Sequence, residues 1–198
     1  TFFRRFLMRT SLLALAAASL FAGAVHAAPA TYAIDPTHTF ATFEIDHNGA
    51  STNRARFDKK EGTLTLDRAG KTGSVDISID TSSVNSGTPA FDKHLQSKDI
   101  FNVAEHPKAR FQSTKFVFDG DKLSAVEGNL TLLGKTQPIT FKASKFNCYP
   151  NKMLQDREVC GGDFETTFDR TAFGLDYGVN YGAAKNVRLV VQIEAVKQ

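Results

Sequence analysis

The sequence predicts an all-β fold made of sequential antiparallel strands. Three observations carry the prediction: segments of alternating apolar and polar residues recur along the chain, short turn signals separate them, and one helix-like segment interrupts the series. Strands with one apolar face can close a sandwich or a barrel, and the alternation fits both. The chain has 198 residues, 41% of them hydrophobic, without a break in composition, so we expect one domain with a substantial core.

Residues 1–27 have the pattern of a secretory signal peptide. Arg4, Arg5 and Arg9 precede an apolar run from Leu12 to Val25, and Val25-His26-Ala27 places small residues where a signal peptidase cleaves. A membrane-spanning anchor is the alternative, but the run falls short of the roughly 18 to 20 apolar residues that cross a bilayer. We therefore expect residues 28–198 to form the mature, exported domain.

The charge of this mature domain argues against one class of partner. Residues 1–27 hold three of the 24 Lys and Arg residues and none of the 21 Asp and Glu residues, which leaves 21 basic and 21 acidic residues. A formally neutral domain lacks the excess positive charge that favours binding to nucleic acid by counterion release. We therefore expect no nucleic-acid partner.

Four strands are expected before the helix-like segment. The clearest is Ser74–Asp80, in which Val75, Ile77 and Ile79 alternate with polar residues and predict one buried and one wet face. The other three are Thr39–His47, Arg54–Phe57 and Thr63–Asp67.

The helix-like segment begins at Pro89, a residue that suits the first helical position. Phe91 and Leu95 lie four residues apart on one face of this segment, and the other face is charged. A turn at His106-Pro107 ends the insertion. Further strands are then expected over Arg110–Phe118, Lys122–Leu133, Gln137–Asn147, Gly162–Arg170 and Asn186–Val196, which gives about eight or nine strands in all.

Cys148 and Cys160 are the only cysteines and are expected to form a disulfide. An exported protein meets an oxidising compartment, where two thiols that bracket a loop usually pair. The bond would close a loop of 13 residues, counting both cysteines. On the chain-entropy model it would stabilise the fold by roughly 3 kcal/mol. We interpret the intervening residues as a long hairpin connection.

Four segments share the order and spacing of one known family. They are Asp35–Ile45 (DPTHTFATFEI), Asp92–Pro107 with its DKHLQS, DIFNV and HP elements, Gly128–Thr136 (GNLTLLGKT), and Asp169–Leu175 (DRTAFGL). Together they resemble the YceI-like family of bacterial periplasmic proteins. The resemblance covers nearly all of the chain from Thr31 to Gln198.

The resemblance implies a lipocalin-like antiparallel eight-stranded β-barrel with the helical insertion at its mouth, in the periplasm. It also implies that the apolar interior holds a long-chain isoprenoid, of the ubiquinone-like or polyprenyl type, or a similar amphiphilic lipid, and that no other cofactor is bound. A barrel of eight strands is about the size at which the lumen either fills with side chains or holds one ligand.

The candidate ligand-binding residues are apolar side chains on the expected inward faces and in the helical insertion. They are Phe43, Ile45, Phe57, Val75, Ile77, Phe91, Leu95, Ile100, Phe101, Phe111, Leu130, Leu132, Phe141, Phe168, Leu189 and Val191. Periodicity alone fits an ordinary packed core equally well. The resemblance favours a ligand tunnel, with Phe91, Leu95, Ile100 and Phe101 as a flap over its opening.

A second candidate is a polar cluster that would bind a ligand head group or hold the helix against the barrel. Its members are His38, Asp92, His94, Asp99 and Arg170. Arg170 could pair with a carboxylate such as Asp92 or Asp99 near the barrel mouth, and such an ion pair would have a structural role.

Neither metal binding nor catalysis is expected. His38, His47, His94 and His106 follow the leader, but no pair of them has a recognised ligand spacing. The sequence also has no GxSxG, HExxH or P-loop motif and no GxGxxG before a helix.

These observations favour a periplasmic carrier that is not an enzyme. The alternative from another functional class is a stress-response scavenger of toxic hydrophobic compounds or antibiotics, and a packed structural barrel is a third. A carrier of this kind would make transient contact with a membrane or a membrane protein. The sequence leaves the oligomeric state open, with a homodimer as one possibility.

Overall fold

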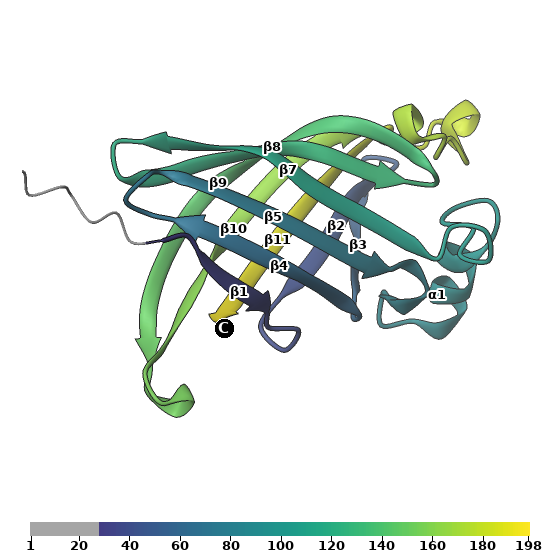
Figure 1. Ribbon diagram of the computed structural model, residues 1–198. Helices are drawn as coiled ribbons and strands as arrows, with labels where there is room; N and C mark the ends of the chain where they lie inside the picture. The colour runs from purple at the N-terminus through teal and green to yellow at the C-terminus, as the bar shows by residue number, and fades with distance from the viewer. Residues whose placement is uncertain (1–27) are drawn as a thin grey trace, which may run out of the picture.

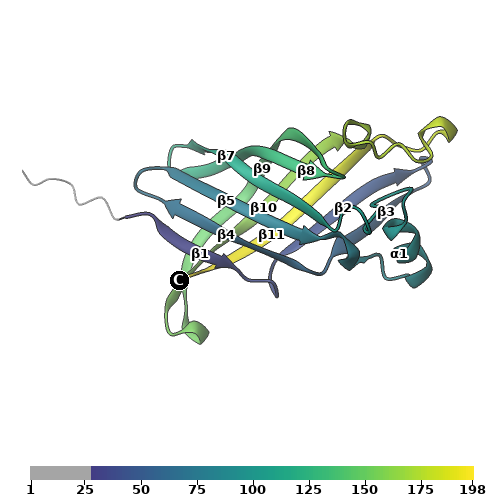
Figure 2. The same ribbon diagram turned by 45° about the vertical axis from the view of Figure 1, so that its right-hand side comes forward.

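The computed structural model describes residues 28–198, so the expected signal peptide lies outside the described residues (Figure 1). Eleven strands form one sheet, and one α-helix lies at one end of it (Figures 1 and 2). The strands are β1 Ala30–Ile34, β2 Phe40–His47, β3 Ser51–Phe57, β4 Lys60–Asp67, β5 Thr72–Asp80, β6 Val84–Asn85, β7 Lys108–Asp119, β8 Lys122–Leu132, β9 Lys135–Asn151, β10 Arg157–Asp169 and β11 Asn186–Lys197. The helices are α1 Pro89–Gln96 and the short 3₁₀ segments η1 Thr81–Ser83, η2 Lys152–Leu154, η3 Arg170–Phe173 and η4 Val179–Tyr181.

Eight antiparallel strands close into a barrel, as expected. They follow the order β1-β4-β5-β7-β8-β9-β10-β11, and β11 returns to β1 through Ala195, Val196 and Lys197. The rest of the same edge of β11 pairs with β2, which leads on to β3 and the two-residue β6. One edge of β11 therefore pairs with two strands, β2 along its first half and β1 at its end.

Two strands, β1 and β6, were not expected from the sequence. β1 is only five residues long and carries two buried apolar side chains with strand spacing, Tyr32 and Ile34. Two positions are too few for alternation to stand out. β6 consists of two residues held by β3.

The prediction of a long loop between Asn147 and Gly162 is wrong, because most of this segment is strand. β9 continues to Asn151 and β10 begins at Arg157, so the two strands form a hairpin that projects from the barrel and ends at η2 (Figure 1). Cys148 and Cys160 face each other in this ladder and form the expected disulfide.

Helix α1 begins where the sequence predicts. Pro89 stands in its first turn after Thr88, and Leu95 is its buried residue. The Asp92 carboxylate accepts hydrogen bonds from the backbone N–H and the hydroxyl of Ser86, each at 2.6 Å. These bonds fix the helix to the segment that follows β6.

Candidate ligand-binding cavity

The barrel encloses an apolar cavity. The centre of a water-sized sphere can move through about 100 Å³ of this cavity, so the free space between its walls is narrow. The wall residues are Thr39, Ala41, Lys60, Leu64, Val75, Ile77, Ile79, Ala109, Arg110, Phe111, Phe116, Leu123, Val126, Leu130, Phe141, Phe146, Cys160, Gly161, Phe164, Leu189, Val191, Ile193 and Ala195.

Small inward residues leave this space open. Ala41 on β2, Ala109 on β7 and Ala195 on β11 are buried and line the cavity. In a barrel of eight strands, ordinary inward side chains are long enough to fill the interior. Three methyl groups at such positions therefore leave a hollow between the larger side chains.

Three aromatic residues pack together in the core beside the cavity. The rings of Phe43, Phe57 and Phe101 contact one another, with centroid distances of 5.3 to 6.0 Å. Phe57 pairs across the sheet with Ala41, which lines the cavity. We call these three rings the aromatic plug; Phe101 connects it to α1, because its N–H donates to the Leu95 carbonyl oxygen at 3.0 Å.

The sixteen expected ligand residues divide into three groups. Seven line the cavity, namely Val75, Ile77, Phe111, Leu130, Phe141, Leu189 and Val191. Eight pack in the core without lining it, namely Phe43, Phe57, Phe91, Leu95, Ile100, Phe101, Leu132 and Phe168. Ile45 is half-buried near the end of β2 and belongs to neither group.

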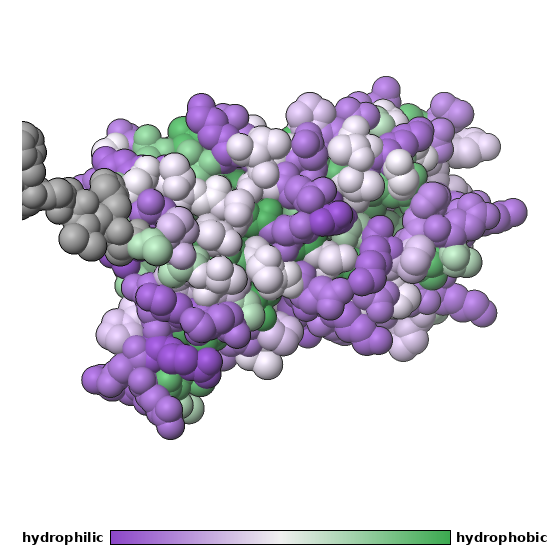
Figure 3. Space-filling view, viewed as in Figure 1, coloured by the Kyte–Doolittle hydropathy of each residue, from purple (hydrophilic) through white to green (hydrophobic). Residues whose placement is uncertain are grey.

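The backbone ladder of the wall is interrupted between β5 and β7. Their pairing stops at Asp76 and Gln112, and beyond it the N–H of Val75 donates to the Ser113 hydroxyl at 2.8 Å. The ring of Phe116 covers the next part of β5, because a Cβ atom placed on Gly73 would lie 2.7 Å from that ring. Side chains close the wall here, and apolar surface is visible among hydrophilic side chains on this face (Figure 3).

Arg170 pairs with no carboxylate of residues 28–198, so the expected ion pair with Asp92 or Asp99 is wrong. Its side chain is 6% exposed and donates to the carbonyl oxygens of Leu175, Tyr177 and Ala184 at 2.8 to 2.9 Å. These carbonyls belong to the turns after η3, which wrap around the guanidinium. Burial lowers the pKa of Arg170, and the three charge-assisted hydrogen bonds offset the loss of water.

His38 and His94 have other partners, although His94 contacts Tyr177, whose carbonyl oxygen Arg170 binds. The His38 ring bonds to Asp35 at 2.7 Å in the turn between β1 and β2. Burial alone would raise the pKa of Asp35, but hydrogen bonds from His38 and Thr37 outweigh it and lower that pKa to about 2. His94 lies between the rings of Phe91 and Tyr177.

Asp99 lines a separate polar pocket on the α1 side of the molecule. Its wall comes from the turn after α1, the turn between β8 and β9, and the segment from η3 to Tyr177. Asn102 and Leu133 stand in this wall with positive φ angles of 42° and 50°. Of the expected polar cluster, only Asp99 lines this pocket.

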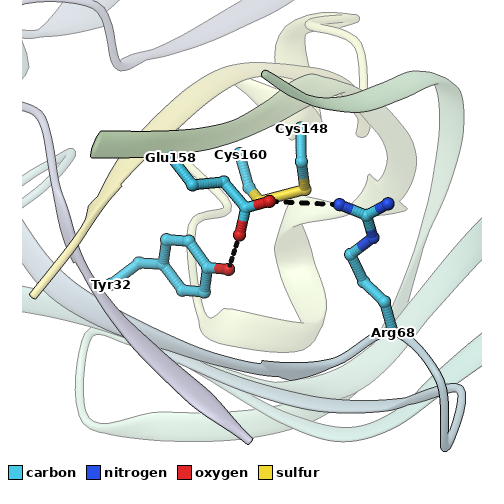
Figure 4. Close-up of a disulfide and its surroundings, with 5 residues drawn as sticks. All are labelled: Tyr32, Arg68, Cys148, Glu158 and Cys160. Atoms are coloured by element: carbon cyan, nitrogen blue, oxygen red, sulfur yellow. Dashed lines mark hydrogen bonds and ion pairs between the residues drawn. A yellow bond between two sulfur atoms is a disulfide. The ribbon is translucent and has the colours of Figure 1, made fainter. Parts of the chain in front are cut away.

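A tyrosine, an ion pair and the disulfide lie together on the side of β1 (Figure 4). The Tyr32 hydroxyl donates to Glu158 at 2.5 Å, and Arg68 donates to the same carboxylate at 3.2 Å. Burial, and then the hydrogen bond and charge of Glu158, raise the pKa of Tyr32 to about 12. Cys160 lines the cavity, so the disulfide is part of its wall.

No group of three or more His, Cys, Asp or Glu side chains within residues 28–198 is arranged to hold a metal ion. The described helices are also too short or too polar to cross a membrane.

Fold and cavity together define a small closed β-barrel with an apolar interior. The YceI-like domain matches residues 32–195, and the chain belongs to that family. It is 35% identical over 198 residues to the protein YceI of Escherichia coli O157:H7, covering 96% of this chain and all of that protein. It is 32% identical over 200 residues to a UPF0312 protein of Pseudomonas aeruginosa, covering 97% of this chain and all of that protein.

Solved structures share the fold at low sequence identity. BcnA of Burkholderia cenocepacia superposes with a TM-score of 0.64 at 20% identity, over 82% of this chain and 99% of BcnA. The YCEI protein of Campylobacter jejuni gives a TM-score of 0.66 at 20% identity, over 78% and 90%. A polyisoprenoid binding domain from Saccharophagus degradans gives 0.61 at 16% identity, over 84% and 98%.

Proposed function

We propose that this protein carries a long-chain isoprenoid, of the quinone or polyprenyl type, in the periplasm, with the tail in the barrel cavity. The observation that carries the proposal is the cavity itself, whose wall is almost wholly apolar, as a site for a hydrocarbon tail must be. The fold shared with a polyisoprenoid binding domain supports the same ligand class. Export would depend on residues 1–27, and the protein would act by binding rather than catalysis.

The energetics suit a carrier that exchanges its ligand with a membrane. Each methylene removed from water contributes about 0.8 kcal/mol, but a bilayer interior and this cavity are similarly apolar. The hydrophobic term therefore nearly cancels when a tail moves between them. Shape and head-group contacts decide which molecule the protein retains.

Access from the α1 end would require the insertion to move. Leu95 and Phe101 are buried, and Phe91 and Ile100 pack against the core. A tail arriving from this side would have to displace Phe101 from the aromatic plug. We therefore retain Phe91, Leu95, Ile100 and Phe101 as the proposed flap.

Extraction of the purified protein tests the proposal. The protein is isolated from its native host without detergent and extracted with organic solvent, and the extract is analysed by mass spectrometry. We expect one isoprenoid class near one molecule per protein chain. Protein that yields no lipid and binds no added isoprenoid would refute the proposal.

Competition distinguishes the carrier from the scavenger. Isoprenoids of increasing length and unrelated hydrophobic compounds are added separately to the loaded protein. A carrier should show a strong preference for one isoprenoid length, whereas similar affinity for unrelated compounds would indicate a scavenger.

A further inference from the structure

Two charged residues, Arg110 and Lys60, line the cavity, and the charged group of Arg110 lies on the outer face of the barrel. The Arg110 guanidinium binds Asp76 on the exposed face of β5. Lys60 is different, because the whole residue is 9% exposed and it forms no ion pair with a carboxylate of the described chain. It is the cation of the cavity wall that lacks a carboxylate partner.

Lys60 lies at a seam of the barrel. β1 pairs with β4 only over Thr63–Leu66, so Lys60 at the start of β4 has no strand partner on that side. On the opposite side of the seam, β11 changes its partner from β1 to β2, and the Thr39 side chain hydrogen-bonds to both the N–H and the C=O of Glu194. Side chains therefore occupy the place of a backbone ladder at this point.

The Lys60 ammonium has fewer acceptors than it can use. Its Nζ donates to the Asp58 carbonyl oxygen at 3.2 Å and lies 4.7 Å from the centroid of the Phe40 ring. An ammonium carries three donors, so two have no oxygen or nitrogen acceptor among the described residues. Burial lowers the pKa of Lys60, and the negative charges of Asp58 and Asp35 offset this loss of water only in part.

The neighbouring carboxylates are bound elsewhere. Asp58 accepts from Arg56 at 2.9 Å and from Asn85 at 2.8 Å, and Asp35 accepts from His38 and Thr37. An unpaired buried cation is costly, and a methionine of similar length could fill the same seam without that cost. The fold alone therefore does not account for a lysine at this position.

We propose that Lys60 binds the anionic head group of an amphiphile whose tail occupies the cavity. This inference rests on the proposed function and narrows it to ligands with a phosphate or carboxylate head. Anionic oxygens at the seam would accept hydrogen bonds from the two remaining N–H groups of Lys60. The adjoining apolar wall would hold the tail. Neutral amphiphiles with the same tail would bind more weakly.

Three probes with one tail test the inference: farnesyl monophosphate, farnesoic acid and farnesol. Their affinities for the lipid-free protein are measured by calorimetry. We expect one or both anionic probes to bind about tenfold or more tightly than farnesol, which corresponds to one charge-assisted contact in a desolvated site. The stronger of the two anions identifies the preferred head group.

Substitutions at Lys60 locate the effect. Lys60→Met should remove the preference, so that the anionic probes bind no more tightly than farnesol does to the same variant, and Lys60→Arg should retain the preference. Lys59→Met is the matched control, because the Lys59 side chain is 75% exposed and lies 3.9 Å from Asp80. This control should behave like the unsubstituted protein.

Other outcomes separate the two proposals. If farnesol and both anions bind equally and Lys60→Met changes nothing, the head-group role of Lys60 is wrong while the carrier proposal stands. If neither these probes nor the longer isoprenoids of the competition experiment bind, both are wrong. Should Lys60→Met fail to fold, labelled lysine side chains are followed by NMR in the unsubstituted protein, where a Lys60 signal that does not respond to bound anion overturns the inference.

Discussion

Filling the cavity with protein atoms gives a change in stability whose sign depends on whether the interior is hollow. Ala41 is 5% exposed and lines the cavity. Ala41→Leu adds three carbon atoms that would enter this space. At about 0.8 kcal/mol per buried methylene, the lipid-free protein should become more stable by up to about 2 kcal/mol. In a packed interior, the same change would instead cost about 1 to 3 kcal/mol.

Ala55→Leu is the matched control. Ala55 is 4% exposed on the neighbouring strand β3, but it pairs with Phe43 of the aromatic plug and does not line the cavity. It should therefore lose about 1 to 3 kcal/mol through overpacking.

Urea denaturation of lipid-free, disulfide-intact protein measures both variants. The slope of unfolding free energy against urea should stay constant if only stability changes. Ala41→Leu should also bind isoprenoids more weakly, since its side chain occupies part of the ligand's space. If Ala41→Leu is as destabilised as Ala55→Leu, the interior has no free space at Ala41 and the reasoning fails.

Three further predictions concern Arg170, the disulfide and Tyr32. Arg170→Met leaves three backbone carbonyls without their donor and should lower the free energy of unfolding, measured by urea denaturation, by about 3 kcal/mol. Arg170→Lys should recover only part of this loss, because an ammonium lacks the planar array of N–H donors of a guanidinium. Replacing both Cys148 and Cys160 by alanine should cost roughly 3 kcal/mol on the chain-entropy model, and equal stability of oxidised and reduced protein would contradict it. The pKa of Tyr32, about 12 in the fold, lies above its ordinary value of 10, so the neutral side chain stabilises the fold below pH 10 and this contribution is lost between pH 10 and 12. Unfolding measured across this pH range should depend less steeply on pH in Tyr32→Phe, and identical profiles would count against the raised pKa.

The regular strands and α1 follow from local sequence patterns. In β5, for example, Val75, Ile77 and Ile79 alternate with polar residues over the whole strand, and the inward set does line the cavity. Pro89 and Leu95 mark the start and the buried face of α1. Such signals depend on neighbours within one element, so they can be recognised without tertiary structure.

Closure of the barrel and the hollow inside it depend on distant residues. β1 closes the barrel through three residue pairs with β11, more than 160 positions away in the sequence. Ala41 and Ala195 leave space only because larger residues surround them, and an alanine in a strand does not by itself indicate an inward position. The strand pattern therefore indicates which rows are apolar, but not how much space remains between them.

Arg170 and Lys60 show the same limit for polar residues. The partners of Arg170 are main-chain carbonyls from turns that follow it, and carbonyls carry no side-chain signature in the sequence. Lys60 reads as an ordinary charged residue at the start of a strand. Its burial arises at the seam of the barrel, where the start of β4 is not paired with β1.

The central claim is that a single extended tail lies inside this barrel. A crystal structure of protein purified from its native host without detergent tests it most directly. We predict continuous tubular density along the cavity, in contact with Leu130, Phe141 and Val191. Side chains that meet across the interior with no such density, or a lipid bound only on the outer surface, would contradict the account.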